Sequence, residues 1–385
     1  MRWLLLFVTL VVPPAECLQV SQSAASQLFP IHVEDRWGYI DGNGDIAVEP
    51  RFLAAGYFRE GLAIAAIPKK ESLFPSSRGG LGYIDTTGTE VIPATYLDAT
   101  DFSEGLAGVC TQEGDWIYVD RQGNTALDPS QQGLHAGIPF SEGLTPVGSK
   151  TGWHYMDKKG TLVIDATAYR WVTSFSEGLA AVQVREGLWG FIDKTGTLVI
   201  PPRFKGVLPF SEGLAPVQID RRWAYIDTKG EIAISPKFRP LVSRRANVVI
   251  GVLQIAFLFF GQWLSSPPLT GYLPIHQFSE GLAAVHTGRN KWAYIDKSGE
   301  IVVESKNRSG LHVPGEFHHG LAESYDGEKL GWMNREGEYV WKPTKASVMW
   351  PRFGKEPIRE PPSGGRLVRI RRRHRPVASN ISSCN

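Results

Sequence analysis

The residues best suited to chemistry recur at regular intervals along this 385-residue sequence. Five copies of Phe-Ser-Glu-Gly-Leu place a hydroxyl beside a carboxylate, and their acidic members are Glu104, Glu142, Glu177, Glu212 and Glu280. Each carboxylate could bind a cation, and the phrase partly resembles the turn that exposes a hydrolase nucleophile. That turn needs a leading glycine, which is missing, and five equal nucleophiles would each need a histidine and an acid. We therefore expect the Ser and Glu side chains to satisfy backbone N–H groups in turns.

Two other groups of side chains could hold a metal ion. Residues 41–45 read Asp-Gly-Asn-Gly-Asp, the opening of a calcium loop, but Ile46 and Phe52 occupy the positions where that loop requires Gly and Glu. A candidate zinc group contains His312, Glu316, His318 and His319. Their spacing matches no common zinc site, and the sequence has no phosphate-binding loop or metalloprotease helix motif. We expect no catalytic residue, no cofactor and no metal site.

These candidates belong to a repeating unit whose centre reads Trp-Gly-Tyr-Ile-Asp or a close variant. The eight copies begin at Trp37, Leu81, Trp116, Trp153, Trp189, Trp223, Trp292 and Leu330. In a strand, the Trp, Tyr and Asp of one copy share a face, and the Gly and Ile share the other. The small residue in the second column predicts close approach by a neighbouring backbone. The aromatic column predicts a core between units in preference to an exposed platform for sugars.

A turn and two further strands complete each unit. All eight copies continue as Asp/Asn-x-x-Gly, where the acid can bond the backbone and Gly supplies a left-handed residue. In the fifth unit, residues 179–184 would form the strand before the centre and residues 197–200 the strand after it. The sequence therefore predicts an all-β chain of three-stranded meanders.

The central phrase, the Asp-x-x-Gly turn, the Ile-Pro-x-x-Phe exit and the Phe-Ser-Glu-Gly-Leu link together resemble the WG (or KWG) repeat family over residues 30–342. The resemblance implies a β-rich repeat array with a presumed binding role and no established catalytic residues. We expect a tandem array of about eight meanders that forms a curved solenoid or a ring. A β-propeller-like arrangement is the alternative, because a standard propeller has four strands in each blade.

The remaining segments divide the chain. Residues 1–17 have a basic start, an apolar run and small residues near Cys17, which predicts a signal peptide. Repeats 1–6 occupy residues 28–239 and repeats 7–8 residues 274–342, separated by a hydrophobic insertion at 240–273. Residues 246–264 are long enough for a membrane helix, but a span would split the array, so we expect a non-spanning insertion or translated non-coding sequence. Residues 343–385 predict a disordered Pro/Arg-rich tail.

The function expected from these features is an exported scaffold without catalysis, located in the periplasm, outside the cell or at its surface. Another protein or a cell-envelope polymer would bind the repeat surface. A carbohydrate-binding module is one alternative, and an enzyme with an unrecognised site is another. The net charge of +2 gives no reason to expect nucleic acid as a partner. The sequence leaves the oligomeric state open.

Overall fold

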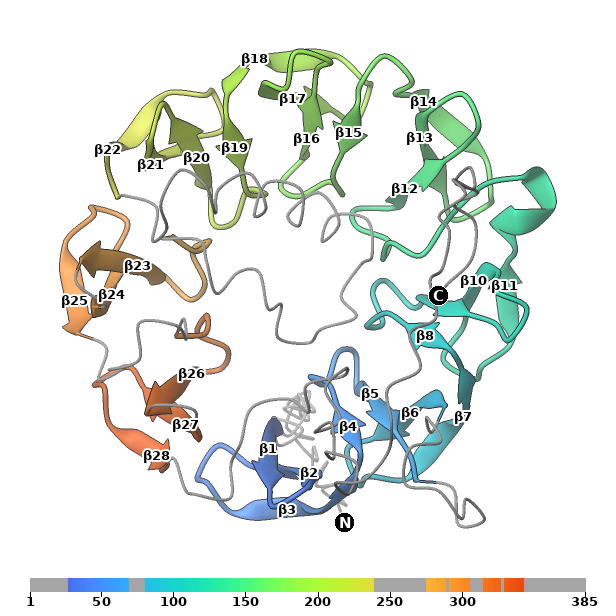
Figure 1. Cartoon of the computed structure of the whole chain (residues 1–385), viewed down its shortest axis with the longest axis vertical. Helices are drawn as coiled ribbons and strands as arrows, with labels where there is room; N and C mark the ends of the chain where they lie inside the picture. Colours follow the sequence, from blue (N-terminus) through green and yellow to red (C-terminus); the bar gives the residue numbers. More distant parts are fainter. Residues whose placement is uncertain are drawn as a thin grey trace, which may run out of the picture.

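A computed structural model describes residues 27–68, 80–238, 275–288, 291–304, 314–326 and 329–342. These residues form eight small antiparallel sheets arranged in a closed ring, which is a β-propeller (Figure 1). The all-β prediction is confirmed, and the propeller arrangement that we considered as the alternative is the one adopted. In Figure 1 the last strand of a sheet, such as β3, β18 or β25, lies at the rim.

The strands follow one another as meanders, with sheets numbered here in chain order. Sheet 1 contains β1 (Phe29–Val33), β2 (Arg36–Ile40) and β3 (Ile46–Phe52). Sheet 2 contains β4 (Ala54–Ala55), β5 (Leu62–Ala66), β6 (Leu81–Asp85) and β7 (Glu90–Tyr96). Sheet 3 contains β8 (Asp98–Ala99), β9 (Ala107–Cys110), β10 (Trp116–Val119) and β11 (Thr125–Leu127). After the 3₁₀ helix η1 (Pro129–Gln132), sheet 4 contains β12 (Leu144–Gly148), β13 (Trp153–Asp157) and β14 (Leu162–Asp165).

The second half of the ring repeats this order. Sheet 5 contains β15 (Trp171–Val172), β16 (Leu179–Gln183), β17 (Trp189–Asp193) and β18 (Leu198–Phe204). Sheet 6 contains β19 (Gly206–Val207), β20 (Ala215–Ile219), β21 (Arg222–Ile226) and β22 (Ile232–Phe238). Sheet 7 contains β23 (Ala283–Gly288), β24 (Lys291–Ile295) and β25 (Ile301–Glu304). Sheet 8 contains β26 (Leu321–Asp326), β27 (Lys329–Asn334) and β28 (Tyr339–Trp341).

Half of the sheets have one strand more than the meander prediction allows. The extra two-residue strands are β4, β8, β15 and β19. Each follows the rim strand of the preceding sheet and pairs with the next sheet, as Ala54 does with Ala66. In sheets 4 and 7 a single bridge, His135 to Gly148 or Ile275 to Val285, stands at the same place. The segments after these six rim strands therefore join neighbouring sheets, which the sequence did not predict.

The glycines of the unit have the two roles that the sequence predicted. Gly196 has φ +83°, and its N–H donates to the Asp193 carbonyl at 2.9 Å, which closes the hairpin turn. In the second column, a Cβ on Gly190 would lie 2.5 Å from the Ile200 carbonyl oxygen of the rim strand. No side chain fits at that distance, so glycine lets the two strands approach closely.

The aromatic column forms the core between sheets. Its eight members are fully buried: Tyr39, Tyr83, Tyr118, Tyr155, Phe191, Tyr225, Tyr294 and Trp332. From Tyr39 to Tyr294, each ring packs on the link phenylalanine of the next sheet with centroids 4.7–5.0 Å apart. The six tyrosine hydroxyls also donate to a carbonyl of that next sheet at 2.7–2.8 Å. The column thus joins each sheet to its neighbour, as expected for a core.

The two ends of the described chain close the ring at a seam between sheets 8 and 1. The Trp332 indole N–H donates to the Pro30 carbonyl at 3.1 Å, and its ring lies 4.8 Å from that of Phe29. Leu321 and Ile40 are buried in the same cluster. An open solenoid, one of the two shapes first expected, is therefore wrong, because the terminal sheets cover each other.

Sheets 6 and 7 make the same contacts as other neighbours, although 36 residues outside the described ranges separate β22 from Ile275. The Tyr225 hydroxyl donates to the His276 carbonyl at 2.7 Å, and Ser211 Oγ donates to the Phe278 carbonyl at 2.6 Å. The expected insertion at 240–273 lies outside the described residues, as do the signal peptide and the tail. In the described ranges, no helix is both long and apolar enough to cross a bilayer.

Exchanging the tyrosine hydroxyl tests its contribution to the joint between sheets. Phe191→Tyr should raise the free energy of unfolding by about 1 kcal/mol, because the new hydroxyl would reach the Leu208 carbonyl of sheet 6. Tyr155→Phe should lower it by about 1 kcal/mol, since the Thr173 carbonyl loses its donor. Urea unfolding of both variants measures the two changes. Equal stability in both would contradict a stabilising role for the hydroxyl.

A second substitution tests the turn. Gly196→Val should lower the free energy of unfolding by more than about 1 kcal/mol, because a β-branched residue is strained at positive φ. The new Cβ would also lie 3.0 Å from Ile164 Cγ2. Gly42→Val is the control, since a Cβ there meets nothing within 4 Å and φ is not positive. If both variants melt at the wild-type temperature, the turn does not need a left-handed residue.

Candidate functional site

The Ser-Glu-Gly-Leu segments are two-residue hairpin turns in an unusual conformation. In the link before β16, the Ser176 N–H donates to the Leu179 carbonyl at 2.9 Å, and the Leu179 N–H donates back at 3.1 Å. Glu177 has φ +55° and Gly178 has φ +78°, the pair of left-handed residues that defines a type I′ turn. A left-handed glutamate costs about 1–2 kcal/mol, so contacts outside the turn must hold it there.

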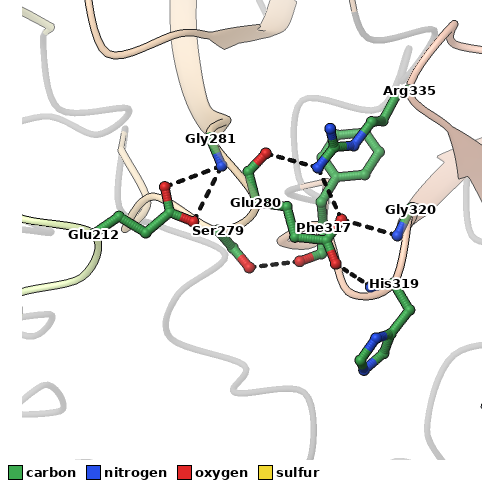
Figure 2. Close-up of polar contacts among 8 residues, drawn as sticks. All are labelled: Glu212, Ser279, Glu280, Gly281, Phe317, His319, Gly320 and Arg335. Atoms are coloured by element: carbon green, nitrogen blue, oxygen red, sulfur yellow. Dashed lines mark hydrogen bonds and ion pairs between the residues drawn. The ribbon is translucent and has the colours of Figure 1, made fainter. Parts of the chain in front are cut away.

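Those contacts come from the next sheet, as Figure 2 shows for sheets 6 to 8. The Glu212 carboxylate accepts from the Gly281 N–H at 3.0 and 3.1 Å, and Ser279 Oγ donates to the Phe317 carbonyl at 2.5 Å. Equivalent Glu-to-Gly contacts start at Glu60, Glu104, Glu142, Glu177 and Glu280. We expected these side chains to satisfy N–H groups within their own turn. They satisfy groups of the following sheet instead, and so connect successive links.

Basic side chains complete four of these contacts. The Lys158, Lys194, Lys297 and Arg335 cations lie 2.8–3.2 Å from the carboxylates of Glu104, Glu142, Glu212 and Glu280. Partial burial alone would raise the pKa of Glu142, but hydrogen bonds from Lys194 and the Gly178 N–H lower that pKa below its usual value. These carboxylates are therefore occupied by the fold, and the cation-binding interpretation of the recurring glutamates has no support in their geometry.

The link serines are also occupied. All five donate to the carbonyl of the next link phenylalanine at 2.5–2.6 Å. None of these hydroxyls is paired with a histidine in the described ranges, so the similarity to a nucleophile turn has no catalytic counterpart. The candidate calcium loop is a hairpin turn, because Asp41 Oδ1 accepts from the N–H groups of Asn43 and Asp45.

Some residues of the links depart from the repeat pattern in sheets 2, 3, 7 and 8, on both sides of the seam. Arg59 replaces the link serine before β5, His318 replaces it before β26, and Asp101 and Glu316 directly precede link phenylalanines. We call the polar residues of this region the seam cluster: Tyr57, Arg59, Asp101, His276, Glu316, His318 and Glu323. Arg59 Nε lies 4.0 Å from Asp101 Oδ2, and His276 Nδ1 lies 3.8 Å from Glu316 Oε1. Both the Tyr57 and Tyr325 hydroxyls donate to the Glu323 carboxylate.

Burial shifts the proton affinities of the seam cluster toward neutral forms. Desolvation raises the pKa of Glu316 to about 7 and that of Asp101 to about 6, although the positive charge of Arg59 opposes both shifts. Desolvation lowers the pKa of His276 and of His318 to about 4. Titratable groups with shifted pKa values that gather in one place are a common mark of functional sites.

A small pocket opens beside this cluster. It has a volume of about 50 Å³ and is lined by Gln27, Leu28, Phe29, Tyr57, Phe58, Arg59, His318 and His319. Its lining residues come from the start of sheet 1 and from the links before β5 and β26. Its size admits the tip of one side chain or a small polar group.

The sequence had singled out two residues of the seam cluster, but as members of a candidate zinc group. Glu316 and His318 came from the candidate zinc group, of which His312 lies outside the described residues and His319 has an exposed side chain. The described ranges contain no group of three His, Cys, Asp or Glu residues that could hold a metal. Arg59, Asp101 and His276 were missed. Arg59 could have been found, since it is a cation in a column otherwise occupied mainly by serine.

The family described as "WG containing repeat" matches five stretches: residues 37–67, 82–116, 153–187, 189–223 and 223–239. These stretches contain central strands of the unit, so the resemblance noted in the sequence is confirmed. None of the curated proteins matches this sequence.

Several solved structures are similar to the ring. They include the computationally designed protein Ika8, with 11% identity, a TM-score of 0.48, and coverage of 84% of this chain and 92% of that one. BamB from Moraxella catarrhalis has 13% identity, a TM-score of 0.42, and coverage of 76% and 88%. Apo AztD from Citrobacter koseri has 12% identity, a TM-score of 0.45, and coverage of 84% and 95%. The propeller fold is assigned from the eight sheets of this chain and not from these similarities.

The contacts between links can be measured with two matched variants. Glu142→Gln should lower the free energy of unfolding more than Glu177→Gln does, by up to about 1 kcal/mol, because Glu142 has a lysine partner and Glu177 has none in the described residues. The position equivalent to Lys194 in the next sheet is Thr228. In a Lys194→Met background the two Gln substitutions should cost the same, as judged by urea unfolding. A difference that survives Lys194→Met would exclude the ion pair as its cause.

The pH dependence of stability tests the environment of Glu316. Its folded pKa of about 7 lies above its ordinary value of 4.5, so the folded state holds the proton more tightly between these two values. Ionisation therefore costs stability as the pH rises from about 4.5 to 7. The advantage of Glu316→Gln over wild type should grow across this range by on the order of 1 kcal/mol, reduced because the side chain is 32% exposed. A difference that is independent of pH would contradict the raised pKa.

Proposed function

Because WG-containing repeats build this chain into a ring of eight sheets, we propose that it is a non-catalytic binding scaffold. One observation carries the proposal. The recurring hydroxyls and carboxylates are used to hold sheets together, whereas side chains that differ between units gather in the seam cluster. In a repeat protein, partner specificity resides in positions that vary between units. The seam cluster is therefore the part of the described surface where we place the partner.

The partner that this cluster favours is a protein. Arg59 is 44% exposed and His319 is exposed, while Asp101 and Glu316 supply acidic groups nearby. Arg and Tyr, which Arg59 and Tyr57 supply here, are enriched in protein interfaces. A cell-envelope polymer remains the other ligand in this proposal.

A carbohydrate-binding module is the second candidate, supported by a different observation. The recurring aromatic column is buried and cannot form a platform for sugars. Trp153 and Trp171, however, are only half-buried and lie 6.3 Å apart by ring centroid, beside each other in sheets 4 and 5. This pair is the site where we place a glycan. An enzyme is a weaker alternative, since the seam cluster lacks a nucleophile with an activating base.

Export also belongs to the proposal. Its support is the sequence of residues 1–17, which lie outside the described residues and carry the arrangement of a secretory signal. The scaffold would then work outside the cytoplasm, in the periplasm, at the cell surface or in the medium.

Proximity labelling by the full-length protein in its native compartment tests the binding role. The wild type is compared with Arg59→Ser/Glu316→Ser, which alters the seam cluster, and with Leu198→Ser/Val199→Ser, which alters an exposed pair at the rim. Labelling of a specific partner should be lost only in the seam variant. Loss only in the rim variant would move the interface elsewhere, and glycan-array binding that disappears in Trp171→Ala would favour the carbohydrate module.

A further inference from the structure

The ring has eight sheets but only seven links. Links with the pattern Phe-x-x-Gly-Leu precede the first long strand of sheets 2 to 8. Sheet 1 has none, because no such phrase occurs in residues 1–36 and the described chain enters β1 directly from Gln27 and Leu28. Within the described residues, one position in the circle therefore has no link. It lies at the seam, between the link of sheet 8 and the link of sheet 2.

Because sheet 1 has no link, the glycine N–H of the link of sheet 2 lacks the glutamate partner that the other link glycines have. In sheets 3 to 8 the link glycine N–H donates to the glutamate of the preceding link; these glycines are Gly105, Gly143, Gly178, Gly213, Gly281 and Gly320. Gly61 is the seventh link glycine. It has the same left-handed conformation, φ +81°, and is exposed, but its N–H has no hydrogen-bond partner in the described residues.

The pocket beside the seam cluster occupies this same gap. His318 and His319 of the last link line one side, Tyr57, Phe58 and Arg59 of the first link line the other, and Gln27 to Phe29 lie between them. A basic residue, Arg59, stands where five other links have serine. Its only ion pair in the described ranges is the 4.0 Å contact with Asp101, so its guanidinium retains donors for a further acceptor.

We propose that this gap is a docking site for a carboxylate carried on a turn of a partner protein. The molecule itself supplies the precedent, because six glutamates on tight turns already bind the equivalent glycine amides. The partner's carboxylate accepts from the Gly61 N–H and from Arg59, a residue that lies two positions before Gly61 and also lines the pocket. Within this chain, residues 18–26 contain no Asp or Glu, whereas residues 343–385 contain Glu356 and Glu360. If Glu356→Gln/Glu360→Gln is needed before the Glu peptide binds, the site is occupied by this chain and the proposal of a partner protein is overturned.

This inference rests on the proposed scaffold role and narrows the partner to a protein with an exposed acidic turn. The replacement of the link Glu by His319 agrees with it. In the six other links a glutamate directs its charge toward the next link, whereas the link that faces the gap has His319 at that position. An acidic partner approaching the gap therefore meets no carboxylate at position 319, and the acids that act on Arg59 are Glu316 and Asp101.

Hydrogen exchange and titration of the full-length, ¹⁵N-glycine-labelled protein test the site. The probe is a cyclic peptide that carries Phe-Ser-Glu-Gly-Leu-Ala, copied from residues 175–180, and its Glu→Gln form is the control. The Gly61 signal is assigned by its loss in Gly61→Asn. In the free protein the Gly61 amide should exchange much faster than those of Gly178 and Gly213. The Glu peptide should shift the Gly61 signal and slow its exchange.

Three variants make the outcome specific. Arg59→Ser, which restores the residue of the other links, should weaken binding of the Glu peptide by about tenfold, because a charge-assisted contact is lost. His319→Glu should weaken it by a similar factor through repulsion, and Arg185→Ser, at an exposed site in sheet 5, should leave it unchanged.

Equal affinity for the Glu and Gln peptides, no shift at about 10 mM peptide, or a Gly61 amide as protected as Gly178 in the free protein would each overturn the proposal. If the peptide binds as expected but proximity labelling yields no partner that depends on the seam, the carboxylate site stands and the scaffold role fails. If labelling is lost in Arg59→Ser/Glu316→Ser but the peptide does not bind, the scaffold role stands and the carboxylate site fails.

Discussion

The joint between neighbouring sheets is the interaction on which the ring depends. A glutamate held in the left-handed region reaches the backbone N–H of the next link, a serine hydroxyl reaches the carbonyl before it, and an aromatic ring packs on the link phenylalanine. None of these contacts is made inside one sheet. A three-stranded sheet alone cannot bury its aromatic face, so each unit gains stability only when its neighbours are present. The conformational cost of the left-handed glutamate is offset by a contact that exists only in the assembled ring.

This use of polar groups explains why the most regular residues are poor candidates for function. A side chain that every unit needs for its joint is not available to a ligand without loosening the ring. The departures from the pattern are different, because a residue such as Arg59 lacks the serine contact that five other links make. Several of these departures meet at the seam, where the ring closes through Trp332 and Phe29 instead of a further link. The residues near the site of closure can therefore differ from the repeat pattern and are available to contact a partner.

The pKa shifts of the seam cluster follow from the same geometry. Link phenylalanines are buried in the core, so the residues directly before them are partly buried as well. Asp101 and Glu316 are acids at that position. Desolvation then favours their neutral forms, while Arg59 from sheet 2 favours their charged forms. The protonation of Asp101 in sheet 3 and Glu316 in sheet 8 consequently depends on Arg59 in sheet 2. Arg59 and Glu316 come close only because the ring is closed.

The sequence by itself determined the strands, the Asp-x-x-Gly turns, the close approach at Gly190 and the buried aromatic column, because alternation and turn chemistry act over a few residues. It also indicated that Ser and Glu of the links would bond to the backbone. It did not reveal that the backbone groups bonded by Ser and Glu belong to the neighbouring sheet. It also did not reveal short strands such as β15, which follow the preceding sheet's rim strand and pair with the next sheet. Closure of the ring and the meeting of Arg59 with Asp101 and Glu316 were decided only by tertiary structure. Trp332 and Pro30 are 302 positions apart, and no local pattern specifies that eight units, each turned by a fixed angle, bring such residues together.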